Sequence, residues 1–503
     1  MGLGKLLEER ARADRERVFL YYQDRKLTIG EIFQRVRSLA AGLFEQGLKP
    51  GDRVGIYLPN CPEAVESLLA VIYAGGIAMP LNPQWKSSEI EAMLGNAGAR
   101  FLILSPAARE EMKRINRQSL AVEQFICIGE RPPEGCFAYH SYFLDKEIEA
   151  ADSGDDQAAV LVHTSGTTGS PKAVMLTHRN LISNFSATAQ FLKLNPDDLI
   201  LGILPLYHVM GMAFALAPVF RAGSVVLAPE FTTGKAMSAL RNLKVTVLAS
   251  VPTAYAILNG LEHHPVDRVS GLKFAISGGA PLAAEIKDRF EARFQTRLLE
   301  GYGLSEATCV STMNPPQGPV KPGSVGVPLP GVKLEVRNED GEVLAHDQVG
   351  ELWVSGEHVM AGYWANPEAT AAVLKDGWLR TMDLGYYDAD GYFYLKGRRK
   401  DLIIRGGENI YPREVEEVLL RHPAIAECAV IGIADWVWGE EVMALVVLKS
   451  GSRLSSSELG EYCHREIADY KCPRLWKIVS ELPKTATGEV ARQKLHEKYR
   501  LDF

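Results

Sequence analysis

The sequence predicts an α/β protein with a large N-terminal domain of helix-covered, mostly parallel sheets and a small α+β C-terminal domain. Three observations lead to this prediction. Buried-strand patterns alternate with amphipathic helix patterns between residues 19 and 277, short strands with turn residues follow from residue 323, and a charged, glycine-rich break spans residues 396–407. Strand and helix alternation is typical of a parallel sheet covered by helices. We expect the large domain at residues 1–398, with a β-rich subdomain at about 323–396, and the small domain at residues 399–503.

The N-terminal elements follow one another in rounds of helix and strand. Thr28 and Glu31 have the spacing of a capping box, which opens a helix. Gly75 and Gly76 mark the end of a second helix. The expected elements of this part are helices that begin near residues 28, 62 and 88, and strands at residues 53–58, 78–81 and 101–104.

The middle of the chain begins with a less regular stretch. Residues 106–155 are rich in charge and contain Pro132, Pro133 and Gly135, so we expect a peripheral connection there. The α/β rhythm resumes with an apolar strand at residues 158–162 and a helix from His178 or Asn180. Further strands are expected at residues 224–227, 245–251 and 273–277, and in the β-rich subdomain at residues 332–337 and 351–355 around a turn at 338–341.

The C-terminal segment has an apolar core of its own. Val415, Val418 and Leu419 share one face of a helix predicted over residues 412–420. The other expected elements are strands at residues 427–433, 442–448 and 475–479 and a helix at residues 457–470. These elements predict a small α+β domain behind a hinge.

Composition excludes several classes of protein. The net charge of −7 and the pI near 6.0 argue against general nucleic-acid binding. The seven cysteines form no C-x-x-C pair, which indicates a reducing compartment. Residues 1–17 lack an apolar signal core, residues 68–79 form an apolar stretch too short to span a bilayer, and the last three residues are not a peroxisomal signal. We therefore expect a cytoplasmic protein without a transmembrane segment.

The strongest functional signal is a hydroxyl-rich glycine loop directly after the strand at residues 158–162. It reads H-T-S-G-T-T-G-S-P-K-A over residues 163–173. Glycines let backbone amides approach an anion, hydroxyls add donors and Lys172 adds positive charge, so the loop suits a polyphosphate. The spacing G-x-x-x-x-G-K-[ST] is excluded, because Gly166 and Gly169 are too close together and Pro171 precedes Lys172. A flexible surface turn is the alternative for any short cluster of this kind.

The order T-S-G-T-T-G-x-P-K resembles the phosphate loop of the adenylate-forming superfamily, which holds acyl- and aryl-CoA ligases, insect luciferases and adenylation domains of peptide synthetases. Further motifs of this family follow in the same order over about 330 residues, far beyond chance. The resemblance implies that ATP is the bound nucleotide. Its implied phosphate-loop contacts are Thr164, Ser165, Gly166, Thr167, Thr168, Gly169 and Lys172.

Two further motifs resemble the walls of the family's acyl and adenine sites. The segment L-P-L-Y-H-V-M-G-M at residues 204–212 implies that His208 borders the acyl pocket. The segment S-G-G-A-P-L at residues 277–282 implies that the backbone of Gly278, Gly279 and Ala280 borders adenine. Judged alone, a histidine beside apolar residues is more often a packed core residue, and the second segment is equally an ordinary strand-to-helix turn.

The motif G-Y-G-L-S-E-A at residues 301–307 combines a ring, a hydroxyl and a carboxylate. The resemblance implies that Tyr302, between Gly301 and Gly303, stacks on adenine. It also implies that the Ser305 hydroxyl contacts the α-phosphate and that Glu306 holds Mg²⁺. Ser305 stands where the family usually has threonine, and a structural Tyr-Gly turn is the alternative.

Two charged side chains resemble the family's ribose contacts. Asp383 matches the aspartate that binds both ribose hydroxyls, and Arg398 matches a second ribose contact. A carboxylate can accept two hydroxyl hydrogen bonds at once. Met382 occupies a position at which the family usually has glycine. Ordinary surface charge is the alternative for both residues.

Lys400 resembles the residue about which family members rotate the small domain between two active orientations. The resemblance therefore implies a mobile C-terminal domain. It also implies that Gly406, Gly407 and Glu408 line the pantetheine path after the rotation. A solvated surface lysine is the alternative for Lys400.

The chain departs from the family in P-K-T-A-T-G-E-V at residues 483–490. The family places a lysine directly after that glycine, where it stabilises charge as the carboxylate attacks the α-phosphate, and here the residue is Glu489. Losing one such electrostatic contact typically costs on the order of a hundredfold in rate. Glu489 therefore predicts a weakened first half-reaction and a largely intact thioester half-reaction, unless Lys484 or Lys494 substitutes.

Together the motifs predict an AMP-forming acyl-CoA ligase. ATP and a carboxylic acid would give acyl-adenylate and pyrophosphate with Mg²⁺, and transfer to coenzyme A would then release AMP. The apolar Val209, Met210 and Met212 favour a fatty or aryl acid. Two alternatives stay open: adenylation for a carrier protein or for oxidation, and a nucleotide or acyl-CoA binding protein with impaired catalysis. The expected partners are the acid, ATP and coenzyme A, without nucleic acid, and the choice between monomer and homodimer stays open.

Overall fold

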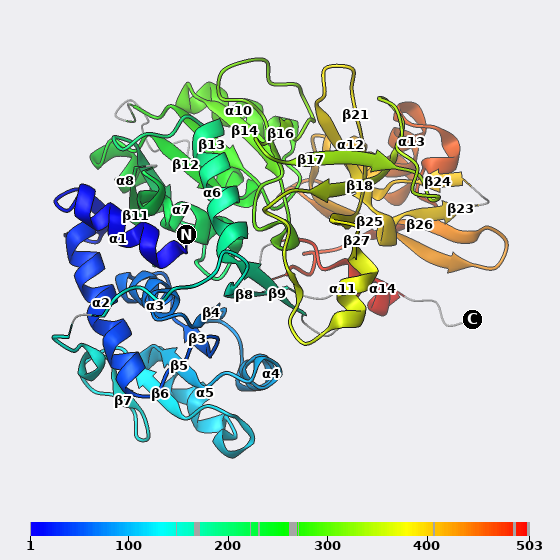
Figure 1. Ribbon diagram of the computed structural model, residues 1–503. Coiled ribbons are helices and arrows are strands. Elements are labelled where there is room, and N and C mark those ends of the chain that lie inside the picture. Colours follow the sequence, from blue (N-terminus) through cyan, green and yellow to red (C-terminus); the bar gives the residue numbers. More distant parts are fainter. Residues whose placement is uncertain are drawn as a thin grey trace.

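The computed structural model describes residues 2–146, 148–164, 172–221, 223–229, 232–260, 269, 271–405, 408–485 and 489–499. Figure 1 shows two large sheets and their helices in the N-terminal part, with further strands and the C-terminal helices beside them. The predicted class, an α/β protein with a large N-terminal and a small C-terminal domain, is confirmed. All seven cysteines are free, in agreement with the absence of a disulfide framework from the sequence.

The first large sheet has the order β16-β15-β14-β13-β12-β10-β11-β1-β2. Its central pairs are parallel, and antiparallel pairs occur only at its two ends among the described strands. The strands are β1 (Val18–Tyr22), β2 (Arg25–Thr28), β10 (Leu199–Gly202), β11 (Ser224–Leu227), β12 (Val247–Ser250), β13 (Phe274–Ser277), β14 (Arg297–Tyr302), β15 (Thr312–Met313) and β16 (Val327–Pro328). The carboxyl ends of the parallel strands therefore share one edge, where open α/β sheets bind ligands.

The second large sheet has the order β19-β9-β8-β4-β3-β5-β6-β7. Its strands are β3 (Arg53–Tyr57), β4 (Ile77–Pro80), β5 (Phe101–Leu104), β6 (Gln124–Cys127), β7 (Phe137–Ala138), β8 (Ala158–Thr164), β9 (Lys172–Thr177) and β19 (Gly362–Tyr363). The expectation of a purely connecting segment at residues 106–155 was wrong, because β6 pairs in parallel with β5 and extends the sheet. Phe125, Ile126 and Cys127 are buried, and this burial stabilises a strand too short for its pattern to stand out.

Helices cover both sheets and also fill the space between them. They are α1 (Leu3–Ala13), α2 (Ile29–Glu45), α3 (Pro62–Tyr73), α4 (Ser87–Ala97), α5 (Arg109–Arg114), α6 (His178–Phe191), α7 (Val209–Ala215), α8 (Thr233–Asn242), α9 (Pro252–Asn259), α10 (Ala284–Phe294) and α11 (Pro367–Val373). The predicted capping box of Thr28 and Glu31 opens α2. Every residue of α3 except Glu63 is buried, as expected of a helix that packs on all sides. Among the described residues, no helix combines the length and apolar character needed to cross a bilayer.

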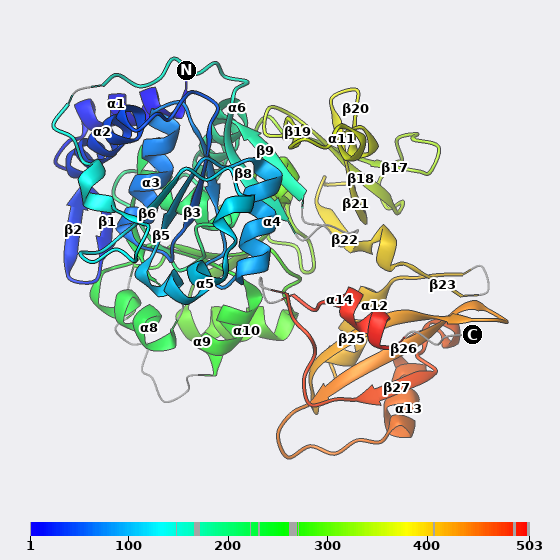
Figure 2. The same ribbon diagram turned by 90° about the horizontal axis from the view of Figure 1, so that it is seen from below.

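A third sheet forms the β-rich part of the large domain. It runs β17-β18-β21-β20, with β22 paired to β21. The strands are β17 (Lys333–Arg337), β18 (Gly350–Ser355), β20 (Leu374–Lys375), β21 (Trp378–Tyr387) and β22 (Phe393–Arg398). Figure 2 shows β22 leading from this sheet toward β23, so β22 lies where the chain passes into the small domain.

In the described part of the small domain, helices pack against a fourth sheet with the order β24-β23-β26-β25 and β27 beside β26. Its elements are β23 (Ile403–Arg405), β24 (Glu408–Ile410), α12 (Pro412–Leu420), β25 (Ile425–Asp435), β26 (Gly439–Leu448), α13 (Ser456–Glu466), β27 (Leu475–Ile478) and α14 (Arg492–Tyr499). The helix predicted to reach residue 470 ends at Glu466, because Ile467 is extended and packs against the domain core. The predicted domain limits stay predictions.

Candidate active site

A cavity of about 930 Å³ brings together most of the predicted site residues. It lies at the carboxyl ends of β10, β12, β13 and β14 and is also lined by β8, β9 and residues from 379 to 400. The predicted residues that line it are Thr164, Lys172, His208, Gly278, Gly279, Gly301, Tyr302, Gly303, Ser305, Glu306, Asp383, Arg398, Lys400 and Glu489. The other predicted phosphate-loop residues (Ser165, Gly166, Thr167, Thr168 and Gly169) and the predicted pantetheine-path residues Gly406 and Gly407 lie outside the described residues.

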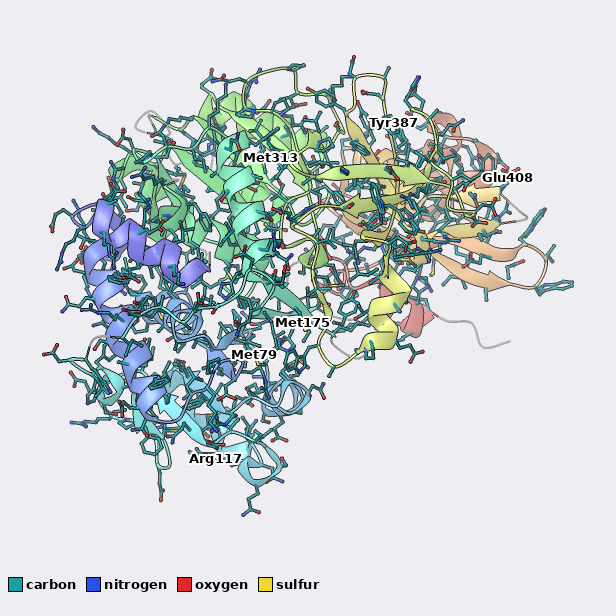
Figure 3. All side chains as sticks on the ribbon, in the orientation of Figure 1. Met79, Arg117, Met175, Met313, Tyr387 and Glu408 are labelled. Carbon is teal, nitrogen blue, oxygen red and sulfur yellow. The ribbon has the colours of Figure 1, made fainter. Side chains whose placement is uncertain are left out.

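Two predicted residues do not line this cavity. Ala280 follows Gly279 into the turn after β13 but is not part of the wall. Glu408 is exposed at the start of β24, and Figure 3 shows it well apart from Met313, which does line the cavity. The proposed pantetheine contact of Glu408 is therefore not formed in this arrangement and stays a prediction for a rotated one.

One end of the cavity holds a hydrogen-bonded tyrosine and carboxylate. The Tyr302 hydroxyl donates to Asp383 Oδ2 at 2.6 Å, and Arg398 Nε lies 3.4 Å from Asp383 Oδ1. Burial raises the pKa of Asp383, with Arg398 acting in the opposite direction. Each oxygen of Asp383 thus faces one donor of the protein and keeps a further acceptor site, so the carboxylate can still accept hydrogen bonds from two sugar hydroxyls.

Gly303 permits the close backbone packing that holds this end together. A Cβ atom at Gly303 would lie 1.7 Å from the carbonyl oxygen of Cys309. No side chain fits at that distance, so the chain can fold back after Tyr302 only with glycine at this position.

A second cluster carries Lys172 and Glu306. The Tyr363 hydroxyl donates to Glu306 Oε1 at 2.8 Å, and Lys172 Nζ lies 4.9 Å from the centre of the Tyr363 ring. β19, which contains Tyr363, pairs with β9, which begins at Lys172, so this contact depends on sheet pairing. Sequence reasoning missed Tyr363 because it lies far from both partners in the chain and carries no motif of its own.

The chain turns sharply directly after Glu306. Thr308 has φ 64° and ψ −53°, a strained γ-turn conformation for a β-branched residue, with a cost of roughly 1–3 kcal/mol. Thr308 is fully buried, and its hydroxyl donates to the carbonyl oxygen of His358 at 2.6 Å. This buried hydrogen bond holds the strained turn and so fixes where Glu306 points.

The opposite end of the cavity is apolar around His208. The apolar side chains that line the cavity from residues 203–276 and 309–313 are Ile203, Leu204, Val209, Met210, Val251, Ala254, Ile257, Ile276, Cys309, Val310 and Met313. Burial lowers the pKa of His208 to about 4, so its ring is neutral at physiological pH. Its Nε2 atom is buried without a partner among the described residues. No lysine or arginine comes from the described wall segments 203–279 and 301–313.

Asn60 is a wall residue that sequence reasoning did not assign to the site. Its side-chain amide donates to the carbonyl oxygen of Leu204 at 2.9 Å and accepts from the backbone N–H of Leu206 at 2.9 Å. Asn60 lies at the end of the loop after β3, whereas Leu204 and Leu206 lie in the loop that carries His208. The amide thus ties the two large sheets together beside the apolar end of the cavity.

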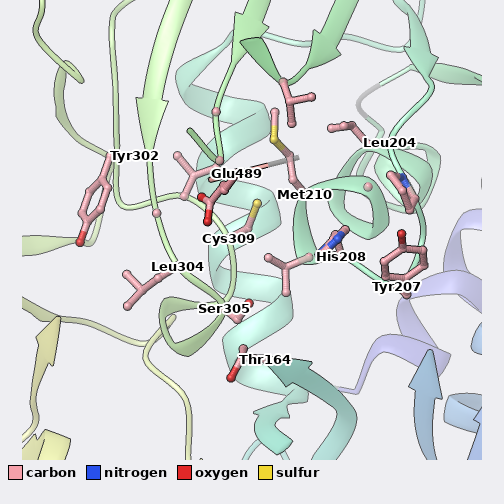
Figure 4. A pocket seen from close by; sticks show the side chains of 18 of the residues that line it. Thr164, Leu204, Tyr207, His208, Met210, Tyr302, Leu304, Ser305, Cys309 and Glu489 are labelled. Atoms are coloured by element: carbon pink, nitrogen blue, oxygen red, sulfur yellow. The ribbon is translucent and has the colours of Figure 1, made fainter. Parts of the chain in front are cut away.

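Glu489 reaches the cavity from the C-terminal domain. Figure 4 shows its carboxylate inside the cavity, between Tyr302 and Met210. Burial raises the pKa of Glu489, opposed chiefly by Arg398 and reinforced by Asp383. Among the described residues, Glu489 has no hydrogen bond or ion pair from its side chain. A carboxylate therefore lines the cavity at the position where the family pattern has a lysine, and its role stays a prediction.

Neither of the two lysines considered as substitutes for the missing cation lines the cavity. Lys484 pairs with Glu427 at 2.9 Å on the small domain. Lys494 lies exposed on α14. Neither lysine therefore stands in for the missing cation in this arrangement.

The chain is similar to known families, to curated enzymes and to solved structures over nearly its whole length. The family described as AMP-binding enzyme matches residues 7–364, and its C-terminal domain family matches residues 414–489. A long-chain-fatty-acid–CoA ligase of Bacillus subtilis strain 168 is 37% identical, over 99% of this chain and 94% of that protein. A feruloyl-CoA synthase of an Amycolatopsis species is 35% identical over 99% of both chains. The crystal structure of ATP-bound MatB from Rhodopseudomonas palustris superimposes with a TM-score of 0.92 at 31% identity and covers 99% of both chains.

Proposed function

Because this chain belongs to the AMP-binding enzyme family and is an AMP-forming acid–CoA ligase, we propose that its acid is a fatty or aryl monocarboxylate. In the first half-reaction the acid and ATP give acyl-adenylate and pyrophosphate. In the second, the thiol of coenzyme A takes the acyl group and AMP leaves. The observation that carries the substrate proposal is the apolar end of the cavity around His208.

The charge distribution of the cavity supports an acid with an uncharged tail. All cationic side chains among its described wall residues come from Lys172 or from residues 380–400, and none from the apolar segments. A second carboxylate or a sulfonate buried at the apolar end would lack a counter-ion, which is costly. A hydrocarbon or aryl tail instead gains from the burial of apolar surface.

We propose that the nucleotide occupies the opposite end. Its ribose would bind Asp383 and Arg398, and its phosphates would lie against Lys172 and Ser305. Mg²⁺ usually keeps several waters and is held by one or two carboxylates plus substrate phosphates, and the single carboxylate of Glu306 fits that donor set. Bound there, the metal would neutralise phosphate charge.

In this arrangement a carboxylate oxygen of the acid attacks the α-phosphorus of ATP, a P–O bond forms, and the bond to the bridging oxygen breaks. Pyrophosphate leaves with that electron pair. The chain's contribution is to hold the two reactants in line and to offset negative charge. His208 is neutral, so it borders the acid without pairing with its carboxylate.

We propose that Glu489 weakens this step. Its carboxylate enters the cavity where the family pattern has a lysine, and an ionised carboxylate repels the phosphate charge that develops in the reaction. Transfer from the adenylate to coenzyme A takes place after the small domain rotates, which removes Glu489 from the cavity. That second half-reaction should therefore proceed normally.

Thioester formation tests the proposal in two formats. The wild-type protein and Glu489→Lys receive either ATP, Mg²⁺ and a panel of fatty, aryl and dicarboxylic acids, or preformed acyl-adenylates, each with coenzyme A. We expect good use of preformed adenylates by both proteins, faster use of free acids by Glu489→Lys, and no product from dicarboxylic acids. Preference for a dicarboxylic acid would refute the substrate class, and equal use of free acids by the two proteins would refute the account of Glu489.

Assays of the wild-type protein and Glu489→Lys also distinguish two alternatives to a ligase that uses free coenzyme A. An enzyme that serves a carrier protein would show acid-dependent pyrophosphate exchange but no thioester with free coenzyme A. A pure binding protein would show neither exchange with any acid nor use of a preformed adenylate, a result that the full-length ligase relatives argue against.

A further inference from the structure

Among the described residues that line the cavity, Lys400 is a cation for which the structure shows no hydrogen bond, ion pair or aromatic-ring contact. The cationic side chains that line it, among the described residues, are Lys172, Arg380, Arg398 and Lys400. Lys172 lies over the Tyr363 ring, and Arg398 lies beside Asp383. Arg380 Nη2 lies 2.9 Å from the buried carboxylate of Glu351. Lys400 forms no hydrogen bond or ion pair with the residues that the structure describes. Its ammonium is thus available to a ligand.

The backbone around Lys400 is held from both sides. Arg399 Nη1 lies 3.2 Å from Glu351 of the large domain. Asp401 Oδ2 lies 3.7 Å from Arg492 Nε of the small domain. The short turn that carries Lys400 is thereby anchored to both domains in this arrangement, while the side chain of Lys400 itself faces the cavity.

The same anchor brings Glu489 to this wall. Arg492, three residues after Glu489, also pairs with Glu416 at 2.7 Å, so the segment is fixed within the small domain. Lys400 and Glu489 line one cavity, and Lys400 is close enough to attract the Glu489 carboxylate. The position at which the family pattern has a lysine therefore shares the cavity with a lysine that has no partner among the described residues.

We propose that Lys400 supplies the positive charge that faces the α-phosphate during adenylation, in place of the lysine that Glu489 replaces. The inference rests on the proposed function. It assigns Lys400 an electrostatic role in the first half-reaction in addition to its predicted role as a hinge.

The chemistry needs no proton transfer from Lys400. As the acid oxygen bonds to the α-phosphorus and pyrophosphate departs, negative charge grows on the non-bridging oxygens. The ammonium stays protonated and offsets that charge. When the Glu489 carboxylate is ionised, it also attracts the ammonium and reduces the stabilisation that Lys400 gives to the phosphate. This competition predicts a first half-reaction that is slowed but still active.

Substitutions at Lys400 distinguish the effect of its positive charge on the reaction from its predicted role as a hinge. Lys400→Met keeps the length of the side chain without its charge, and Lys400→Arg keeps the charge. Lys494→Met, on the exposed face of α14, is the matched control. Each protein is assayed for acid-dependent exchange of radiolabelled pyrophosphate into ATP, and separately for thioester formation from a preformed acyl-adenylate and coenzyme A.

We expect Lys400→Met to lose roughly a hundredfold in kcat of exchange, with Lys400→Arg and Lys494→Met close to wild type. Thioester formation from the preformed adenylate should change by less than about threefold in all variants. Adding Glu489→Lys to Lys400→Met should restore exchange. Unchanged exchange in Lys400→Met, or an equal fall in both half-reactions, would overturn the proposal and leave Lys400 as a hinge residue only.

Failure of the inference is distinguishable from failure of the proposed function. If the proposed acid class is wrong, the wild-type protein itself shows neither exchange with fatty or aryl acids nor thioester formation from their adenylates. If only the role of Lys400 is wrong, the wild-type protein shows both activities and Lys400→Met retains its exchange.

Discussion

Single side chains set the electrostatics of the cavity, and Glu489 is the one whose charge opposes the proposed reaction. Charged groups that face it are Asp383, Arg398, Lys400 and Arg492. Burial raises its pKa above the ordinary value of 4.5. The protonated form is therefore more populated in the protein than in water, and pH controls how much repulsion the phosphate meets.

Glu489 should give adenylation a pH dependence of known sign. As pH rises through its raised pKa, the carboxylate ionises and the exchange rate of the wild-type protein should fall. Glu489→Gln cannot ionise, so the rate ratio of Glu489→Gln to wild type should grow as pH rises from about 5 to about 8. Exchange rates at saturating ATP and acid measure this ratio. A ratio that stays constant would show that Glu489 does not face the reacting phosphate.

Met382 is a residue whose backbone carries strain next to Asp383. Its φ is 61°, in the left-handed region that favours glycine. Met382→Gly should raise the free energy of unfolding by about 0.5–1 kcal/mol, since relief of the left-handed strain exceeds the added entropy of the unfolded chain. Urea unfolding of the two proteins measures the difference. A lower midpoint for Met382→Gly would mean that contacts of the methionine side chain outweigh the strain.

At the scale of elements, the loop between β10 and α7 positions His208, and Asn60 holds that loop from the other large sheet. Asn60→Ala leaves the carbonyl of Leu204 and the N–H of Leu206 buried without partners, at a cost of roughly 1–3 kcal/mol. We expect a several-fold rise in KM for the acid with a much smaller change in KM for ATP.

Steady-state kinetics with each substrate varied in turn test the role of Asn60. Asn60→Asp serves as a companion variant, because it keeps the acceptor for Leu206 but loses the donor for Leu204. An equal rise of KM for both substrates in Asn60→Ala would indicate general loss of structure and contradict the positioning role.

At the scale of the whole molecule, the two domains meet at a buried carboxylate. Burial raises the pKa of Glu300, which lies within β14, to about 7. Arg413 and Lys287 oppose this rise, and Glu417 adds to it. Arg413 and Glu417 belong to α12 of the small domain and pair with each other at 2.9 Å. The charge state of Glu300 therefore depends on where the small domain lies.

Glu300 should make the protein less stable as pH rises. Its pKa is higher in the folded protein than its ordinary value of 4.5, so the folded state holds the proton more tightly and stability is lost between about pH 4.5 and about pH 7. Glu300→Gln should therefore raise stability at pH 8 by on the order of 2–3 kcal/mol and much less at pH 5. Thermal unfolding at the two pH values measures this, with Glu417→Gln as control. An equal change in stability by Glu300→Gln at pH 8 and at pH 5 would contradict this prediction.

The elements with strong local signals could be predicted from the sequence. The bounds of α12 agree with the predicted range, and α2 begins at the predicted capping box, because caps and apolar periodicity act within a few residues. β1, β2 and β6 had no such signal. β6 is only four residues long, and what makes it a strand is its pairing with β5.

The residues of the candidate site also fall into two groups, those that sequence motifs indicate and those that only the structure identifies. Short motifs contain Lys172, Glu306 and Asp383, so their chemical types and their order in the chain are enough to indicate an adenylate-forming cavity. The roles of these residues stay predictions. Tyr363 and Asn60 could not be found, because each contacts the site through side chains of residues far away in the sequence.

The sequence by itself determined the fold class, the family resemblance and the departure at Glu489, because these depend on residue types and local spacing. Only the tertiary structure decided which charges meet. Lys400 and Glu489 lie far apart in the chain. They line one cavity because Arg492 pairs with Asp401 within the small domain and because that domain packs against the large one in this orientation. Such contacts follow from the burial of whole surfaces and the docking of domains, which no local pattern encodes.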